Sequence, residues 1–238
     1  MSPTPAAAPH ELAPGLVIQR FQAPLARSAY RAIAFDMDST LINIECIDEI
    51  ADAAGKKAEV AAITEAAMRG EITDFSESLR RRVALLAGVS AEFLAEVYTQ
   101  RLRLNPGATE LLAAAREAGW ATLLVSGGFT YFADRVRERL QIDTAFSNTL
   151  EIVDGRLTGR VLGAIVDGAA KRQHLLDLCA RLGCEPSQAI AVGDGANDLP
   201  MMGAAGLSVA FHAKPKVREQ AMLAINDGGL DRLLEVVT

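Results

Sequence analysis

The chain has 238 residues, 50% of them hydrophobic and 23% charged, which allows one large core or a core with an inserted subdomain. Its formal net charge of -6 argues against a nucleic-acid-binding surface. No run is long and apolar enough to cross a bilayer, and the N-terminus lacks the basic-then-apolar order of a signal peptide. The three cysteines are an odd number without metal-site spacing, which favours a reducing compartment over a disulfide framework. We therefore predict a cytoplasmic protein with neither a nucleic-acid nor a membrane partner.

The first 30 residues are predicted to form an N-terminal extension. Residues 3–9 are rich in proline and alanine, a composition typical of a flexible tail. The apolar run Leu16-Val17-Ile18 that follows is expected either to add a strand or to pack on the core.

The first strand of the core is predicted at residues 31–36, and it leads into Asp36-Met37-Asp38-Ser39-Thr40. Two carboxylates at one strand end are unfavourable unless a cation, a shared proton or a chemical role compensates for them. A nucleophilic carboxylate beside a second carboxyl group that transfers protons, both near a hard divalent metal, suits phosphoryl transfer. The simpler interpretation is an Asx turn that caps the following helix.

Residues 45–104 contain only helical patterns, with segments expected at 56–69, 75–86 and 91–102. Glycines separate these segments, and Asn105-Pro106-Gly107 marks the return to the core. The insertion begins at the strand end that carries the two carboxylates. We therefore predict a small helical cap subdomain at 45–104, inserted after the first core strand into a core domain of residues 31–44 and 105–238.

Short apolar runs and amphipathic segments alternate through the rest of the chain. Strands are expected at 120–126, 144–147, 189–193, 207–211 and 223–226. Helices of crossover length are expected at 107–118, 129–140, 170–182 and 214–222. Alternating residues at 150–159 around Asp154-Gly155 indicate a hairpin. This order predicts an α/β fold with a doubly wound, mainly parallel sheet.

Three polar clusters follow these strands or begin helices. Ser126-Gly127-Gly128 offers a hydroxyl group and free backbone amides to an anion, although a plain tight turn uses the same glycines. The run from Gly193 to Asp198 adds two carboxylates and an amide, or simply caps a helix. Lys171 begins a helix, where most lysines are solvated. Because the carboxyl ends of such strands share one edge, Asp36, Ser126 and Asp194 are expected to converge at the topological switch point.

The chain resembles the haloacid dehalogenase superfamily of aspartyl phosphatases, because it contains that family's four motifs in order: Asp36 to Thr40, Ser126 to Gly128, Lys171, and Gly193 to Asp198. The resemblance covers roughly residues 31–237. It implies an Mg²⁺-dependent enzyme that forms an aspartyl-phosphate. More narrowly, the cap residues resemble those of the branch that hydrolyses O-phosphoserine to serine and phosphate, the last step of serine biosynthesis.

Roles for the core residues are implied by the resemblance. Asp36 attacks phosphorus, while Asp38 protonates the leaving oxygen and later deprotonates water. Magnesium binds the carboxylates of Asp36 and Asp194 and the main-chain carbonyl of Asp38, with Asp198 supporting these ligands. The phosphoryl oxygens bind Ser126, Gly127, Lys171 and Asn197.

In the cap, the resemblance implies that Arg82 binds the substrate carboxylate and Glu45 its ammonium group. Met68 and Phe75 are implied to exclude water. Each of these residues has a simpler interpretation. Met68 and Phe75 lie on helical patterns where core packing is common, Arg82 belongs to a basic run, and Glu45 can cap a helix.

Two other functions stay open. A phospho-accepting receiver module gathers similar residues at the edge of a doubly wound sheet, although the helical insertion and Asp38 argue against it. A phosphotransferase that passes the phosphoryl group to another alcohol, such as homoserine, uses the same chemistry. The expected substrate is a small molecule, O-phosphoserine, and the chain is compatible with a homodimer.

Overall fold

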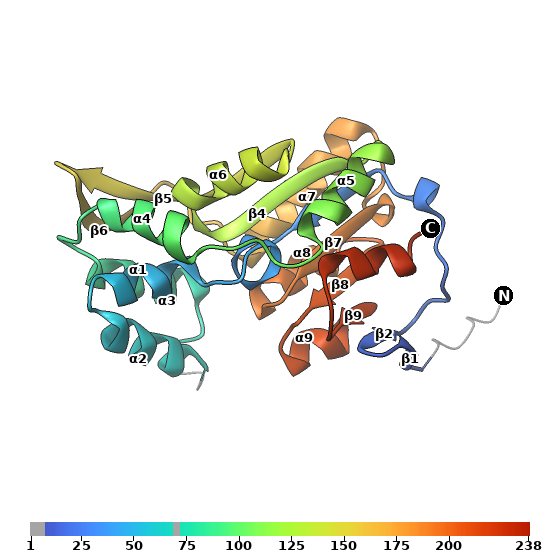
Figure 1. Ribbon diagram of the computed structural model, residues 1–238, viewed down its shortest axis with the longest axis horizontal. Coiled ribbons are helices and arrows are strands. Elements are labelled where there is room, and N and C mark those ends of the chain that lie inside the picture. Colours follow the sequence, from blue (N-terminus) through green and yellow to red (C-terminus); the bar gives the residue numbers. More distant parts are fainter. Residues whose placement is uncertain (1–7, 69–71) are drawn as a thin grey trace.

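The computed structural model describes residues 8–68 and 72–238, without the side chains of residues 67 and 68. The described residues form a nine-stranded sheet with the order β1-β2-β9-β8-β7-β3-β4-β5-β6 (Figure 1). Its strands are β1 (His10–Ala13), β2 (Leu16–Ile18), β3 (Ala32–Phe35), β4 (Ala121–Phe129), β5 (Thr144–Val153), β6 (Arg156–Leu162), β7 (Ala189–Gly193), β8 (Leu207–Phe211) and β9 (Leu223–Ile225). Neighbouring strands from β9 to β5 run parallel, whereas the pairs β1–β2, β2–β9 and β5–β6 are antiparallel. The predicted doubly wound, mainly parallel sheet is therefore confirmed.

The predicted core strands are present with small shifts at their ends. The strand expected at 144–147 continues to Val153, because it enters the predicted hairpin and pairs there with β6. Gly155 in the hairpin turn has a φ of 72°, which glycine adopts without a clash of Cβ. The run at 16–18 forms β2 and pairs with β9. No predicted element corresponds to β1, and residues 3–7 of the expected tail lie outside the described part of the chain.

Helices cover both faces of the sheet. They are α5 (Ala108–Glu117), α6 (Thr130–Leu140), α7 (Gly168–Leu182), α8 (Leu199–Met202) and α9 (Pro215–Gln220), with short 3₁₀ helices at Arg27–Ala29, Pro186–Gln188, Ala196–Asp198 and Leu230–Glu235. Along β3, Ile33 and Phe35 are buried in one core cluster with α5 and α6, whereas Ala32 and Ala34 are buried in another with α7, α8 and α9. Burial of Ile33 or Phe35 contributes about 1.5 to 3 kcal/mol each. The strand that leads to Asp36 is therefore anchored on both faces.

The helices between residues 45 and 104, which we call the helical segment, lie at the end of the molecule opposite β1, β2 and the C-terminus (Figure 1). They are α1 (Cys46–Ala53), α2 (Lys57–Met68), α3 (Phe75–Leu85), α4 (Glu92–Glu96) and a π-helical turn (Val97–Arg101). The helices expected at 56–69 and 75–86 correspond to α2 and α3, and the one expected at 91–102 is divided into α4 and the π-helical turn. No predicted helix corresponds to α1.

The β5–β6 hairpin extends from the sheet and joins the helical segment. Leu157 of β6 accepts a backbone hydrogen bond from Gly88 at 2.8 Å and donates one to Val89 at 2.9 Å. Ala91 donates to Gly155 in the hairpin turn at 2.8 Å. One strand of the sheet thus contacts the inserted helices directly.

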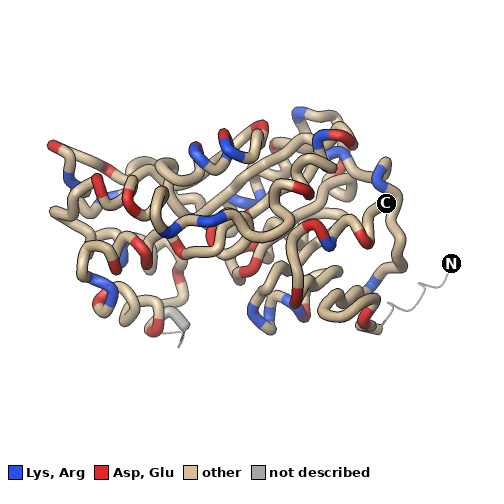
Figure 2. Tube along the Cα trace, in the orientation of Figure 1, with Lys and Arg blue, Asp and Glu red and all other residues tan. Residues whose placement is uncertain are grey.

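The switch point of the sheet lies at the carboxyl end of β3, which has β4 on one side and β7 on the other. The helical segment leaves the sheet directly after this strand. Figure 2 shows basic and acidic residues of the described chain interspersed along the whole trace. Among the described residues, no helix has both the length and the apolar character that a membrane span requires.

Candidate active site

Asp36 directly follows β3, and Asp38 lies on the turn that comes next. This turn, Met37–Leu41, departs from helical geometry at Asp38 and at Ser39, where φ is 56°. The N–H of Asp36 donates to the carbonyl of Val192 in β7 at 3.0 Å, which fixes the end of β3 to the neighbouring strand. Met37 is fully buried in the core. Because Met37 occupies the core side of the turn, both aspartate side chains line the pocket above the sheet.

Lys171 is fully buried and bridges two carboxylates. Its Nζ donates to Oδ1 of Asp36 at 2.6 Å and to Oδ1 of Asp198 at 2.7 Å. Burial alone would lower the pKa of Lys171, but Asp198 and Asp36 outweigh it and hold the pKa above the ordinary value. Lys171 is therefore a buried, charged group beside Asp36. The simpler interpretation of Lys171 as a solvated lysine is wrong.

Asp198 is buried, and both of its carboxylate oxygens already accept hydrogen bonds from the protein. Its second oxygen, Oδ2, accepts the backbone N–H groups of Gly195 at 2.9 Å and Asp194 at 3.2 Å. At Gly193, an added Cβ would lie 2.5 Å from the carboxylate carbon of Asp198, so the turn needs glycine there. These contacts present the Asp194 side chain to the pocket.

Asp36, Asp194 and Asp198 carry carboxylate oxygens that lie within 4.8 Å of one another. Burial, with the charge of Asp198 as the next cause, raises the pKa of Asp194 to about 7. The same two causes hold the pKa of Asp36 well above its usual range, against the opposing effect of Lys171. A single lysine does not neutralise three carboxylates. An all-oxygen, electron-rich donor set of this kind fits a hard divalent cation.

Asp38 meets different surroundings two residues later. Burial, followed by the charge of Glu45, raises the pKa of Asp38 to about 8. Its Oδ1 is buried and has no hydrogen-bond partner among the described residues. A carboxyl group with a raised pKa and an unpaired oxygen can hold a proton near neutrality and transfer it within the pocket.

The turn Ser126-Gly127-Gly128 lies within β4, beside Asp38. Ser126 is fully buried, and its Oγ accepts the N–H of Gly128 at 2.8 Å. A Cβ at Gly128 would lie 2.9 Å from Oδ2 of Asp38, and a Cβ at Gly127 would lie 2.6 Å from the ring of Phe75. Both glycines thus permit close approach to the pocket, which a plain turn does not require. Asn197 lines the same pocket.

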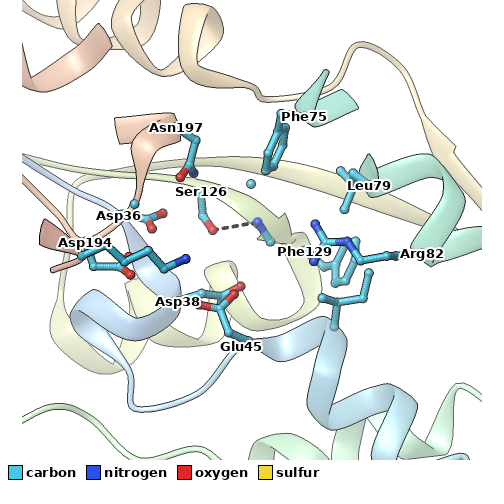
Figure 3. Close-up of a pocket in the computed structure, with 15 residues that line it drawn as sticks. Asp36, Asp38, Glu45, Phe75, Leu79, Arg82, Ser126, Phe129, Asp194 and Asn197 are labelled. Atoms are coloured by element: carbon cyan, nitrogen blue, oxygen red, sulfur yellow. Dashed lines mark hydrogen bonds between the residues drawn. The ribbon is translucent and has the colours of Figure 1, made fainter. Parts of the chain in front are cut away.

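The expected convergence of Asp36, Ser126 and Asp194 is observed, since all three line one cavity of about 100 Å³. Figure 3 shows the carboxylates of Asp36, Asp38, Asp194 and Glu45 around one end of this pocket, whereas α3 supplies Phe75, Leu79 and Arg82 at the other. An adjoining cavity of about 560 Å³ shares Glu45, Phe75, Arg82 and Asn197 with it. The pocket therefore lies between the sheet and the helical segment.

Arg82 and Glu45 provide opposite charges to this pocket. The Nε of Arg82 is buried without a partner among the described residues, and burial lowers the pKa of Arg82 despite the nearby Asp48 and Glu45. Glu45 accepts a hydrogen bond from the Oγ of Ser39 at 2.7 Å, and its side chain makes no capping hydrogen bond to α1. A cation and an anion placed this way can bind a zwitterionic ligand.

Phe75 is partly buried at the start of α3 and faces Gly127 across the pocket, although it also packs against the core. The side chain of Met68, the other apolar residue expected at the site, lies outside the described part of the chain. Lys214 lines both cavities without having been among the predicted residues. Its position just after β8, on the same edge of the sheet as Asp36 and Asp194, is the signal that could have identified it.

A family model for haloacid dehalogenase-like hydrolases matches residues 30–206. The chain therefore belongs to the haloacid dehalogenase-like hydrolases. Two relatives that it resembles in sequence are named phosphoserine phosphatase. The protein of Polaromonas sp. (strain JS666) is 66% identical over 96% of this chain and 99% of its own length. The protein of Albidiferax ferrireducens is 64% identical over 96% of this chain and 98% of its own length.

Solved structures match as well. A phospho-aspartyl intermediate analogue of phosphoserine phosphatase superposes with a TM-score of 0.82 and 39% sequence identity, covering 88% of this chain and 99% of that chain.

Proposed function

We propose that this protein is a phosphoserine phosphatase, which hydrolyses O-phosphoserine to serine and phosphate in the last step of serine biosynthesis. One observation carries the proposal: the buried Asp36 and the half-buried Asp38 share a pocket with the oppositely charged Arg82 and Glu45. The first pair suits phosphoryl transfer, and the second suits the carboxylate and ammonium groups of an amino acid. Close relatives that bear this name support the same conclusion.

The proposed mechanism uses the two aspartates in sequence. Asp36 attacks phosphorus through a carboxylate oxygen, and the bond between phosphorus and the serine oxygen breaks as an aspartyl-phosphate forms. Asp38 donates its proton to the leaving serine oxygen. Asp38 then takes a proton from water as the water oxygen attacks phosphorus, which releases phosphate and restores Asp36. The unpaired Oδ1 of Asp38 supports this role.

Four groups are proposed to bind the phosphoryl oxygens: the Ser126 hydroxyl, the Gly127 N–H, the Lys171 ammonium and the Asn197 amide. Lys171 is already hydrogen-bonded to Asp36, so it lies beside the atom that attacks. Fixed donors of this kind stabilise the charge of an in-line transition state without reorganisation at the moment of reaction.

Magnesium is the proposed metal. Its proposed ligands are the carboxylates of Asp36 and Asp194 and the main-chain carbonyl of Asp38, while Asp198, occupied by Lys171 and two backbone amides, supports them. When bound, the ion neutralises the acidic cluster and polarises the phosphoryl group.

The helical segment is proposed to act as a cap subdomain of residues 45–104 on a core of residues 31–44 and 105–238. Residues 1–30 are proposed as an N-terminal extension, part of which adds β1 and β2 to the sheet edge. Met68 and Phe75 are proposed to exclude water from the bound substrate. We further propose a cytoplasmic location and a small-molecule substrate, and a homodimer remains compatible with the chain.

The experiment is a panel of phosphomonoesters assayed for phosphate release with and without a chelator. We expect repeated turnover of O-phosphoserine that chelation abolishes. A receiver module would retain one phosphoryl group per chain instead. A phosphotransferase would form a new phosphomonoester when homoserine is added, so product analysis separates transfer from hydrolysis.

A further inference from the structure

The side chain of Asn148 in β5 connects two parts of the proposed phosphate site. It is only 1% exposed, and both ends of its amide are hydrogen-bonded. The Nδ2 group donates to the carbonyl of Gly127 at 2.8 Å, and Oδ1 accepts the N–H of Val166 at 2.8 Å. A carbonyl needs a donor and an N–H needs an acceptor, so only a neutral amide satisfies both partners.

An irregularity in the sheet creates the need for this side chain. Val125 of β4 is paired with Phe146, and the next pairing is Phe129 with Asn148, so residues 126–128 stand opposite residue 147 alone. The turn that carries Ser126 and Gly127 therefore bulges out of the ladder with β5. A carbonyl that is shielded from water at such a bulge needs a donor, and the Nδ2 group of Asn148 supplies one.

The contact with Gly127 also orients Ser126. The carbonyl of Gly127 and the N–H of Gly128 belong to one planar peptide unit, so fixing one fixes the other. That N–H donates to the Oγ of Ser126 at 2.8 Å. Because the Ser126 oxygen accepts this bond, its own O–H is left to donate to a ligand.

The contact with Val166 connects Asn148 to the start of α7, the helix that carries Lys171. Val166 precedes Asp167, whose side chain accepts the N–H of Ala170 at 2.9 Å and caps α7. The N–H of Lys171 donates to the carbonyl of Asp167 at 2.8 Å in the same first turn. Asn148 therefore holds the start of the helix that carries Lys171 at a fixed place relative to the Ser126 turn.

We propose that Asn148 is a positioning residue that orients the Ser126–Gly128 turn against the start of α7, so that both present their groups to one phosphoryl ligand. The inference rests on the proposed function, since it takes Ser126, Gly127 and Lys171 as the phosphate-binding groups. Asn148 touches neither substrate nor metal in this role. It acts through the peptide of Gly127 and the backbone of Val166.

The test compares Asn148→Ala and Asn148→Asp with Thr122→Val as a matched control. Thr122 is also 1% exposed and lies on β4, and its Oγ1 is hydrogen-bonded to Asp143 at the opposite end of that strand. The Asp variant keeps the shape and the acceptor of Asn148 but loses the donor. The probe is inorganic phosphate with MgCl₂ present, and its dissociation constant is measured by calorimetry alongside the thermal unfolding midpoint.

We expect both Asn148 variants to weaken phosphate binding about tenfold or more, as loss of about 1.4 kcal/mol does, and to lower kcat/KM similarly. Thr122→Val should lose comparable thermal stability while both constants stay within about twofold. If Asn148→Ala loses stability but keeps its phosphate affinity, Asn148 is purely structural and the proposal fails. If Thr122→Val weakens phosphate binding equally, the effect is general loosening and the proposal also fails.

If the Asn148 variants do not fold, the proposal can still be tested by a measurement on the wild type. Without phosphate, the Gly128 amide should already resist hydrogen exchange as strongly as the amide of Thr122, because Asn148 holds the turn in place. Free exchange at Gly128 with protection at Thr122 would contradict the proposal. Since phosphate binding is measured without phosphoserine, a wild type that binds phosphate but does not hydrolyse phosphoserine refutes the proposed substrate and leaves the role of Asn148 to be judged by these variants.

Discussion

Asp36 and Asp38 are chemically identical side chains that differ through their neighbours. Lys171 donates directly to Asp36 and lowers the pKa of that carboxyl group, although burial and Asp198 still hold this pKa above its usual range. Asp38 has no such cation in contact, its pKa is raised to about 8 chiefly by burial, and one oxygen is unpaired among the described residues. The cation in contact with Asp36 and the unpaired oxygen of Asp38 are consistent with the roles proposed for them, nucleophilic attack and proton transfer.

Separate substitutions at these two positions should have different effects. Asp36→Asn should abolish the covalent intermediate with every substrate, because the amide is a poor nucleophile. Asp38→Asn should lose less activity on p-nitrophenyl phosphate than on O-phosphoserine, since the nitrophenolate leaves without a proton. Initial rates on both substrates and trapping of the phosphorylated residue check this. A phosphoryl group found on any residue other than Asp36 would contradict the assignment.

Arg82 should determine the preference for a substrate with a carboxylate. A charge-assisted hydrogen bond contributes about 1.5 to 3 kcal/mol, so the wild type should prefer O-phosphoserine over phosphoethanolamine by at least about tenfold in kcat/KM. Arg82→Ala should remove most of this preference, because phosphoethanolamine does not use the contact. The ratio of the two kcat/KM values is the measurement. An equal loss with both substrates would make Arg82 a structural residue of α3.

At the scale of elements, the site depends on how closely α3 approaches β4. Phe75, Leu79 and Arg82 recur at the spacing of one helix face, so a single helix presents all three to the pocket. The side chain of Asp74 caps this helix by accepting the N–H of Ser76 at 2.8 Å, which sets where it begins. Phe75 thereby reaches the turn at Gly127.

Gly127→Ala should test this approach. The added Cβ would lie 2.6 Å from the Phe75 ring, so the ring or the turn must move. We expect kcat/KM for O-phosphoserine to fall about tenfold or more, and the second change Phe75→Leu to recover part of that loss by making room. Kinetics of the two single variants and the double variant form the cycle. Strictly additive losses would show that Phe75 and Gly127 do not constrain each other.

Elements with a complete local pattern were predictable. β7 and β8 match their expected bounds because each is a short, mainly apolar run that is followed by polar residues. α1 was missed because its eight residues are shorter than the window in which helical periodicity is visible. Individual contacts between segments that are distant in the sequence could not be predicted either. Lys171 meets Asp36 across 135 positions of the chain, and Asn148 lies in no motif at all.

At the scale of the whole molecule, the site gathers negative charge that does not contribute to the packing of the apolar core. Asp36 and Asp198 are buried and Asp194 is half-buried at the edge of a sheet whose core is large and apolar. The pKa of Asp194 is raised to about 7 and that of Asp36 is also raised, so the folded protein binds protons there more tightly than the unfolded chain. Folding stability and metal binding are therefore linked through pH.

The metal-free protein should lose stability as pH rises from about 4 to about 7, because folded-state pKa values above the unfolded value favour folding only while the proton is bound. Mg²⁺ requires the ionised carboxylates, so its stabilising effect should grow over the same range. At about pH 7.5 a saturating excess should raise the unfolding midpoint by about 5 to 10 °C, and at about pH 5 much less. Thermal unfolding with and without MgCl₂ measures this.

Asp194→Asn provides the control for that experiment. Without metal it should be more stable than the wild type at about pH 7.5, because it removes one uncompensated buried charge, and Mg²⁺ should stabilise it little. Equal stabilisation of both proteins by Mg²⁺ would place the ion elsewhere.

The course of β5 limits how the helical segment can move. The two chain crossings into that segment pair with each other at Ile42 and Leu104, while the hairpin forms a third connection through its bonds to residues 88–91. Rotation about the two crossings alone would break the bonds to residues 88–91, so an opening that keeps these bonds must bend β5 beyond Asn148, where its pairing with β4 ends. Bending one strand stores elastic energy that drives the segment back. The lifetime of an open pocket, and with it the departure of products, depends on the stiffness of residues 149–153.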